Sequence, residues 1–131
     1  MDQEVKAIFS SIGGFDCLDI ISSINYELIR DNPKILCGYS DVTILLNAVF
    51  AKTGLITYYG PHFSSFGMLH GNEFTIDFFK KSLFQNTPFT VGISDVWSED
   101  DWFIDQENRK FIRNQGPVLL NDGECEGELV S

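Results

Sequence analysis

The sequence predicts an α/β protein built on an open, doubly wound, mostly parallel sheet. Short apolar runs alternate with segments whose apolar residues recur at helical spacing, and glycine or proline separates them. This alternation is typical of parallel strands joined by right-handed helical crossovers. With 131 residues, of which 44% are apolar, the chain suits one globular domain and is too apolar for disorder.

The first strand is expected at residues 5–12 and ends at Gly13-Gly14. Apolar residues then recur at helical spacing over 17–28, which predicts a helix that Asn32-Pro33 terminates. A second strand is expected at 34–39. These segments give the order strand, helix, strand.

A second helix is expected to begin at Ser40 and Asp41 and to end at Gly54, a residue typical of helix C-caps. Its apolar residues extend almost all round, so we expect it to be buried on most sides. A third strand follows at 55–59. A further helix is expected at 72–85, and a fourth strand at 89–93.

Composition changes near Ser94. Residues 94–131 contain ten acidic and three basic residues (net −7), against nine acidic and six basic residues before them (net −3). This tail holds the acidic run 122–128 and shows no helical period. An extended, solvated linker is therefore expected.

The net charge of −10 argues against nucleic acid or a membrane surface as partner, because phosphates repel an acidic protein. The N-terminus lacks the features of a signal peptide, and no apolar run approaches the roughly 20 residues that span a bilayer. A cytoplasmic protein is expected. Cys17, Cys37 and Cys125 are widely spaced, which predicts reduced thiols, the first two buried, and neither a metal nor another cofactor.

Ser40 is the leading candidate for a catalytic residue. It lies between the second strand and the second helix, at the carboxyl edge of the sheet where ligands bind. There a serine hydroxyl projects outward, and the first N–H groups of the helix can stabilise an oxyanion. The usual G-x-S-x-G pattern is not met, because Val42 replaces the last glycine. The alternative is that Ser40 only caps the helix.

Gly13-Gly14 and His62 reach the same edge after the first and third strands. The glycine pair could present N–H groups to an oxyanion or a substrate carboxylate, or could form only a tight turn. His62 could approach Ser40 as a general base, although a histidine at the surface or in a loop is the commoner outcome. His70 is a weaker candidate.

Trp97 and Trp102 lie in a polar segment with Ser98, Glu99, Asp100 and Asp101. Exposed aromatic residues of this kind could form a platform for a planar ligand. Packing against a partner is an equal alternative.

Several segments resemble the LD-carboxypeptidase family of serine peptidases. They are residues 5–8, 12–14, 28–34, 38–43, 45–48, 51–55 and 59–61. The stretch 97–113 and the ending Gly127-Glu128-Leu129 are most similar to the microcin C immunity branch of that family. The resemblance covers nearly the whole chain and is most specific between 32 and 43.

The resemblance implies a Ser-His-Glu triad divided between two domains, with Ser40 as the nucleophile. It implies that the N–H groups of Asp41 and Gly14 form the oxyanion hole, with Gly13 beside the substrate. It also implies that Trp97 and Trp102 hold the nucleotide-like part of a peptidyl-nucleotide substrate. A homodimer is implied for the full-length family member.

Members of the family begin with a further strand and helix and continue into a C-terminal domain that carries the glutamate and the histidine. We therefore expect an internal piece, in which 1–93 form a partial flavodoxin-like nucleophile domain and 94–131 form a linker and the start of the next domain. The leading hypothesis is a serine carboxypeptidase that acts by acyl transfer on peptidoglycan LD-peptides or microcin-like substrates and is inactive as this piece. The alternatives are a small hydrolase using Ser40 and His62, and a non-catalytic remnant that binds a ligand or partner.

Overall fold

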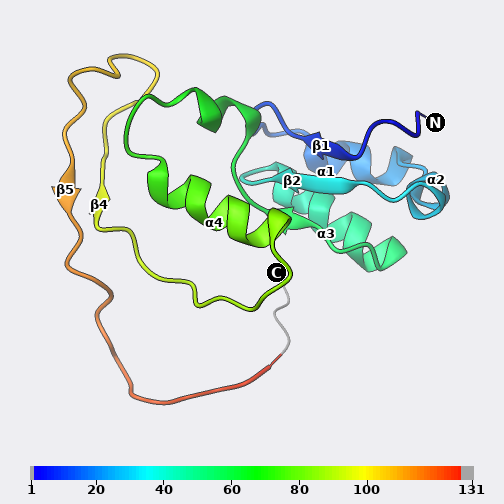
Figure 1. Cartoon of the computed structure of the whole chain (residues 1–131). Coiled ribbons are helices and arrows are strands. Elements are labelled where there is room, and N and C mark those ends of the chain that lie inside the picture. The colour runs from blue at the N-terminus through cyan, green and yellow to red at the C-terminus, as the bar shows by residue number, and fades with distance from the viewer. Residues whose placement is uncertain (1, 128–131) are drawn as a thin grey trace. The chain divides into compact units, whose positions relative to one another are not determined.

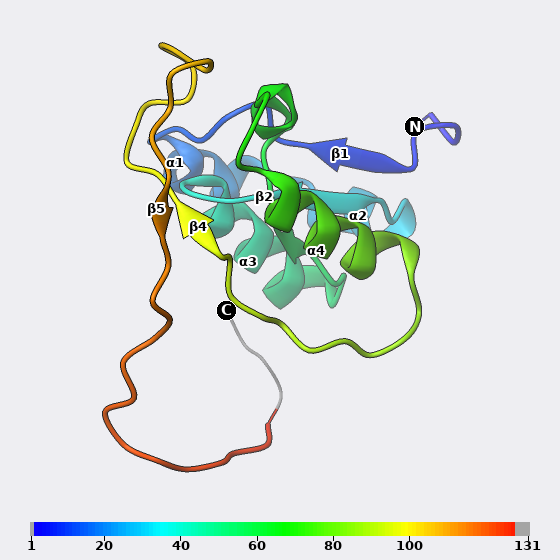
Figure 2. The same ribbon diagram turned by 60° about the vertical axis from the view of Figure 1, so that its left-hand side comes forward.

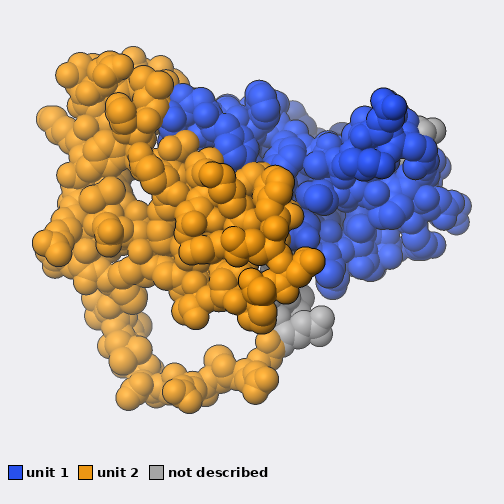
Figure 3. All heavy atoms as spheres, viewed as in Figure 1, with its two compact units in different colours: residues 1–68 blue, residues 69–131 orange. Residues whose placement is uncertain are grey.

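The structure is a computed structural model that describes residues 2–127, and it divides the chain into two compact units, residues 1–68 and residues 69–131 (Figure 3). The first unit contains a three-stranded parallel sheet with helices, and the second contains one long helix and a two-stranded ribbon. The predicted α/β fold with a parallel sheet is confirmed. The domain boundary predicted after residue 93 lies inside the second unit and stays a prediction.

The sheet of the first unit consists of β1 (Ala7–Phe9), β2 (Ile35–Gly38) and β3 (Tyr58–Tyr59), in the spatial order β1-β2-β3 (Figure 1). The central strand β2 pairs in parallel with both neighbours, so that Phe9 lies opposite Cys37 and Gly38 lies opposite Tyr59. Because sequence order and spatial order agree, two right-handed crossovers carry their helices to the same side of the sheet. The helices that join these strands pack against one another on that side (Figure 2).

Helix α3 (Val42–Thr53) is the central helix of the first unit and contacts both β2 and β3. Leu46 and Val49 are its buried residues. It ends at Gly54 as predicted, where φ is 74° and the N–H donates to the Phe50 carbonyl at 2.8 Å. The expectation of burial on most sides was wrong. Phe50 is 43% exposed, because within the unit only one side of the helix faces the sheet and its neighbouring helices.

The helix predicted over 17–28 is broken into three pieces. They are α1 (Cys17–Ile20), the 3₁₀ helix η1 (Ile21–Ser23) and α2 (Tyr26–Asp31). Ile24 is extended, with φ −79° and ψ 134°, and the Asn25 side chain then accepts from the Leu28 N–H at 2.9 Å. Asparagine is among the strongest N-cap residues, so it ends one helical segment and starts the next.

The second unit contains α4 (Glu73–Phe84), which confirms the helix predicted at 72–85, and an antiparallel ribbon of β4 (Val96–Trp97) and β5 (Ile112–Arg113). The strand predicted at 89–93 was wrong. Phe89 packs its ring against Phe78 of α4 at 5.8 Å, so the aromatic residue that suggested a strand covers a helix instead. Among the described residues, no helix is both long and apolar enough to cross a membrane.

Candidate active site at the β2–α3 turn

Ser40 occupies a sharp turn between β2 and α3. Its φ is 63°, and it is the one non-glycine residue with positive φ in the described part of the chain. For a residue with a side chain this conformation costs roughly 1–2 kcal/mol, and it persists only where the surroundings impose it. The N-cap position of α3 is Asp41, without a side-chain capping bond, so the interpretation of Ser40 as a helix cap was wrong. Ser40 is exposed, as an attacking residue needs to be.

The loop after β1 brings Gly13 against Ser40. A methyl group built on Gly13 would lie 2.8 Å from Ser40 Oγ and 2.9 Å from Ser40 Cβ. Position 13 therefore has no room for a side chain while Ser40 stays in place. At Gly14, an added Cβ would lie 3.4 Å from Asp41 Oδ2. The structure thus brings the predicted glycine pair to Ser40 and Asp41, with Gly13 next to the hydroxyl.

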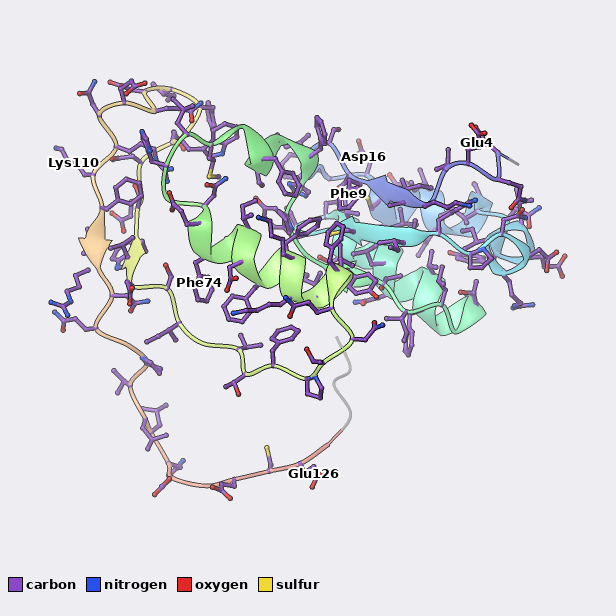
Figure 4. The ribbon with its side chains drawn as sticks, viewed as in Figure 1. Glu4, Phe9, Asp16, Phe74, Lys110 and Glu126 are labelled. Carbon is purple, nitrogen blue, oxygen red and sulfur yellow. The ribbon has the colours of Figure 1, made fainter. Side chains whose placement is uncertain are left out.

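The side chain of Asp41 links the loop after β1 to the start of α3 by a hydrogen bond. Its Oδ2 accepts from the Cys17 N–H at 3.0 Å, across 24 positions of sequence. Figure 4 labels Asp16, which directly precedes Cys17, and shows this loop following Phe9 of β1. Burial, and then the hydrogen bond that the thiol donates to the Asp41 carboxylate, raise the pKa of the half-buried Cys17 thiol. Sequence reasoning considered only the N–H of Asp41 and missed its carboxylate.

A cavity of about 240 Å³ opens beside this contact. It is lined by Ile12, Gly13, Gly14, Phe15, Asp16, Cys17, Ile20, Asp41 and Val42. The N–H groups that begin a helix have no intrahelical acceptor. The first turn of α3 and the glycine loop therefore border one small hollow next to the serine.

His62 lies beneath the turn. The expectation was a histidine at the surface or in a loop: it does lie in a loop, between β3 and the 3₁₀ helix η2 (Phe63–Gly67), but it is only 3% exposed and so is not at the surface. Its Nε2 lies 2.8 Å from the Tyr39 carbonyl oxygen, and its ring stacks on that of Tyr39 with centroids 3.9 Å apart. His62 is buried because the backbone segments that follow β1 and β3 are hydrogen-bonded to each other beyond the end of β2.

The two predicted tryptophans lie in the second unit. Trp97 belongs to β4 and is 43% exposed, whereas Trp102 is half-buried and packs edge-on against Phe103 with ring centroids 5.9 Å apart. His70 is exposed, and its carbonyl accepts from Arg109 at 2.8 Å. Trp97 therefore keeps an exposed aromatic surface, whereas Trp102 already has an aromatic neighbour.

The thiol of Cys37 in β2 is buried under the turn, and its titration makes the stability of the fold depend on pH. The thiol is 2% exposed, and burial raises its pKa from 9.0 to about 11. The folded pKa lies above the unfolded value, so the stabilisation is complete below about pH 9 and is lost as the pH rises toward 11. We expect the free energy of unfolding in urea to fall over that window, and to fall less in Cys37→Ala. An equal fall in both proteins would contradict the assignment.

The features above define a class of protein: an α/β domain with an exposed, strained serine at a strand-to-helix turn, the geometry that holds the nucleophile in α/β-hydrolases. Comparison with known proteins then gives the family. Residues 1–60 match the model described as the LD-carboxypeptidase N-terminal domain, and the chain belongs to this family.

Relatives and solved structures agree with this assignment. The chain is 48% identical over 129 residues to "Putative carboxypeptidase YocD" of Bacillus subtilis, covering 98% of this chain and 40% of that protein. It is 34% identical over 137 residues to the microcin C7 self-immunity protein MccF of Escherichia coli, covering 97% of this chain and 39% of MccF. An MccF-like protein from Bacillus anthracis has a similar structure, with TM-score 0.85 and 55% identity over 88% of this chain and 35% of that one.

These comparisons confirm the predicted resemblance, including the microcin immunity branch. The chain spans about two fifths of the length of the curated relatives it matches, 40% of YocD and 39% of MccF.

Proposed function

We propose that the chain carries the nucleophile of a serine-type carboxypeptidase, and that this nucleophile is Ser40. The observation that supports this most directly is the conformation of Ser40, which is exposed with φ 63° at the end of β2. A strained backbone at one residue, kept by the fold, is typical of a functional position. The contact with Gly13 adds a donor loop within reach of the hydroxyl.

The proposed reaction is acyl transfer. Ser40 Oγ attacks the carbonyl carbon of the scissile amide, forming an ester while the C–N bond breaks, and water then hydrolyses the ester. The N–H groups of Asp41 and Gly14 stabilise the oxyanion, each donor of this kind being worth roughly 10²–10³-fold in rate. The proton passes to the leaving amine through the His-Glu pair that the family resemblance places in the C-terminal domain.

The proposed substrates are peptides with a free carboxylate, either peptidoglycan LD-peptides or peptidyl nucleotides. One relative is named a probable murein peptide carboxypeptidase, and MccF has been solved in complex with aspartyl sulfamoyl adenosine. The exposed Trp97 supports an aromatic contact with a nucleotide-like group, with Trp102 nearby in sequence. Quenching of tryptophan fluorescence by adenosine monophosphate tests this contact, and unchanged fluorescence would reject it.

A chimera tests the nucleophile. This chain replaces the matching segment of YocD, which supplies the remaining length of the family protein. We expect a fluorophosphonate probe to label the chimera on Ser40, and the chimera to cleave an LD-peptide or an aminoacyl sulfamoyl adenosine. Ser40→Ala abolishes both activities, whereas Ser82→Ala, at an exposed position of α4, leaves them unchanged. A folded chimera labelled equally in Ser40→Ala would defeat the proposal.

A further inference from the structure

His62 is a titratable side chain that lies buried next to the turn. Three groups surround its ring. The Tyr39 carbonyl oxygen lies 2.8 Å from Nε2, the Tyr39 ring stacks on it with an interplanar angle of 20°, and a Cβ built on Gly13 would lie 3.4 Å from Cε1. The imidazole therefore contacts the residue before Ser40 and lies near the glycine beside it.

The backbone on both sides of His62 is fixed by hydrogen bonds. Before it, the Gly60 N–H donates to the Gly38 carbonyl at 3.0 Å. After it, the Phe63 and Ser64 N–H groups donate to the Ser10 and Ser11 carbonyls at 2.8 and 3.2 Å. The segment that carries His62 is thus hydrogen-bonded to the end of β2 before the histidine and to the loop after β1 behind it.

The hydrogen bond to Tyr39 sets the state of the ring. A backbone carbonyl can only accept, so Nε2 carries the proton and donates it. In neutral imidazole the remaining acceptor is then Nδ1. Nε2 is engaged with the backbone, and it has no lone pair with which to take a proton from Ser40.

The accepting carbonyl belongs to the peptide group that joins Tyr39 to Ser40. The φ angle of Ser40 is the rotation between that peptide plane and the Ser40 Cα substituents. Holding the carbonyl oxygen therefore fixes one side of the torsion that stands at 63°. A strained torsion relaxes unless its surroundings over-determine it, and this hydrogen bond is partly buried, where it is electrostatically stronger than in water.

We propose that His62 is a positioning residue for the serine: its Nε2–H, bound to the Tyr39 carbonyl, holds the peptide before Ser40 and keeps the turn in its attacking conformation. This role rests on the proposed function of Ser40, and it differs from the general-base role that a Ser40-His62 hydrolase requires. His62 acts through the backbone and does not contact the reacting atoms.

The first measurement does not depend on catalysis. The full chain contains only two histidines, so ¹⁵N-histidine labelling gives two imidazole signal sets, and His70→Asn leaves only that of His62. We expect the neutral Nε2–H tautomer with a slowly exchanging ring proton. An Nδ1–H tautomer, or a ring proton that exchanges as in a free histidine, would overturn the proposal.

The second measurement compares two variants. The Gln side chain in His62→Gln places an N–H donor near the position of Nε2, whereas His62→Leu offers similar bulk without a donor. In the YocD chimera, we expect fluorophosphonate labelling of Ser40 to fall at least about tenfold in His62→Leu and to return to within about threefold in His62→Gln, because a misplacement near 1 Å can cost about 10²-fold. Loss of labelling in both folded variants would indicate a base and reject the positioning role.

A structural readout separates this proposal from that of the nucleophile. The backbone ¹³C and ¹⁵N shifts of Ser40 report its φ in the full chain. They are expected to move in His62→Leu and to stay in His62→Gln, even if the parent chimera labels nowhere and the peptidase proposal fails. Unchanged Ser40 shifts in a folded His62→Leu protein would contradict the inference. If His62→Leu does not fold, His62→Ala takes its place. The proposal then expects the Ser40 backbone shifts to be altered in His62→Ala and unaltered in His62→Gln.

Discussion

Gly13→Ala is expected to slow acylation of Ser40 by about 10²-fold or more, because misplacing a reacting group by near 1 Å costs about that much. The added methyl would lie 2.8 Å from Ser40 Oγ and 2.9 Å from Ser40 Cβ, closer than carbon atoms approach without a shift. The hydroxyl can rotate away, but Cβ cannot move without changing the turn itself. Either the serine or the glycine loop must be displaced.

The rate of fluorophosphonate labelling in the YocD chimera measures this effect. Gly92→Ala is the matched control, because a Cβ at position 92 meets nothing within 4 Å and its φ is not in the left-handed region. The control is expected to label at the parent rate, and circular dichroism should show both variants folded. Gly13→Ala labelling as fast as the parent would mean that the loop does not restrict Ser40.

The local features of the turn could be predicted from the sequence. The strand of β2, the start of α3 and the C-cap at Gly54 follow from a short apolar run, a helical period and a glycine in the left-handed region, all properties of neighbouring residues. Placing Ser40 at the carboxyl edge of the sheet needs only the rule for parallel strands. The candidate nucleophile was therefore accessible without coordinates.

The supporting contacts were not accessible in that way. The hydrogen bond between Asp41 and Cys17 joins residues 24 positions apart in the sequence, and that between His62 and Tyr39 joins residues 23 positions apart. Such contacts depend on how the segments after β1 and β3 close over the end of β2, and no local periodicity encodes that closure. The same limit explains why the strand predicted at 89–93 was wrong: Phe89 is a residue type common in strands, but it packs on α4.

A distinction follows for the histidine. From sequence alone, a histidine after the third strand suggests a base because base and nucleophile share the sheet edge. The coordinates add the direction of its ring nitrogen, which points to a backbone carbonyl 2.8 Å away. Proximity to a serine is therefore weak evidence for a base until the hydrogen-bond partner of the imidazole is known.

Gly38→Ala is the substitution expected to cost the most stability. Gly38 is the last residue of β2, and a methyl group there would overlap Ser10 Oγ and lie 3.2 Å from Ser10 Cβ and 3.1 Å from Val42 Cγ1. Gly38 itself is buried, so the added volume has no exit toward solvent. Overpacking of this kind costs about 1–3 kcal/mol in the free energy of unfolding, which urea denaturation measures.

Ser10→Ala provides the decisive comparison for Gly38→Ala. Ser10 Oγ is buried without a hydrogen-bond partner among the described residues, so removing it alone is expected to change stability little. In the double variant, loss of the hydroxyl makes room for part of the new methyl group, and the loss of stability should be at least about 0.5 kcal/mol smaller than the sum of the single losses. Gly123→Ala, at a position with no atom within 4 Å of a built Cβ, controls for the glycine-to-alanine change itself. Strict additivity of the two substitutions would show that the loop after β1 does not press on the end of β2.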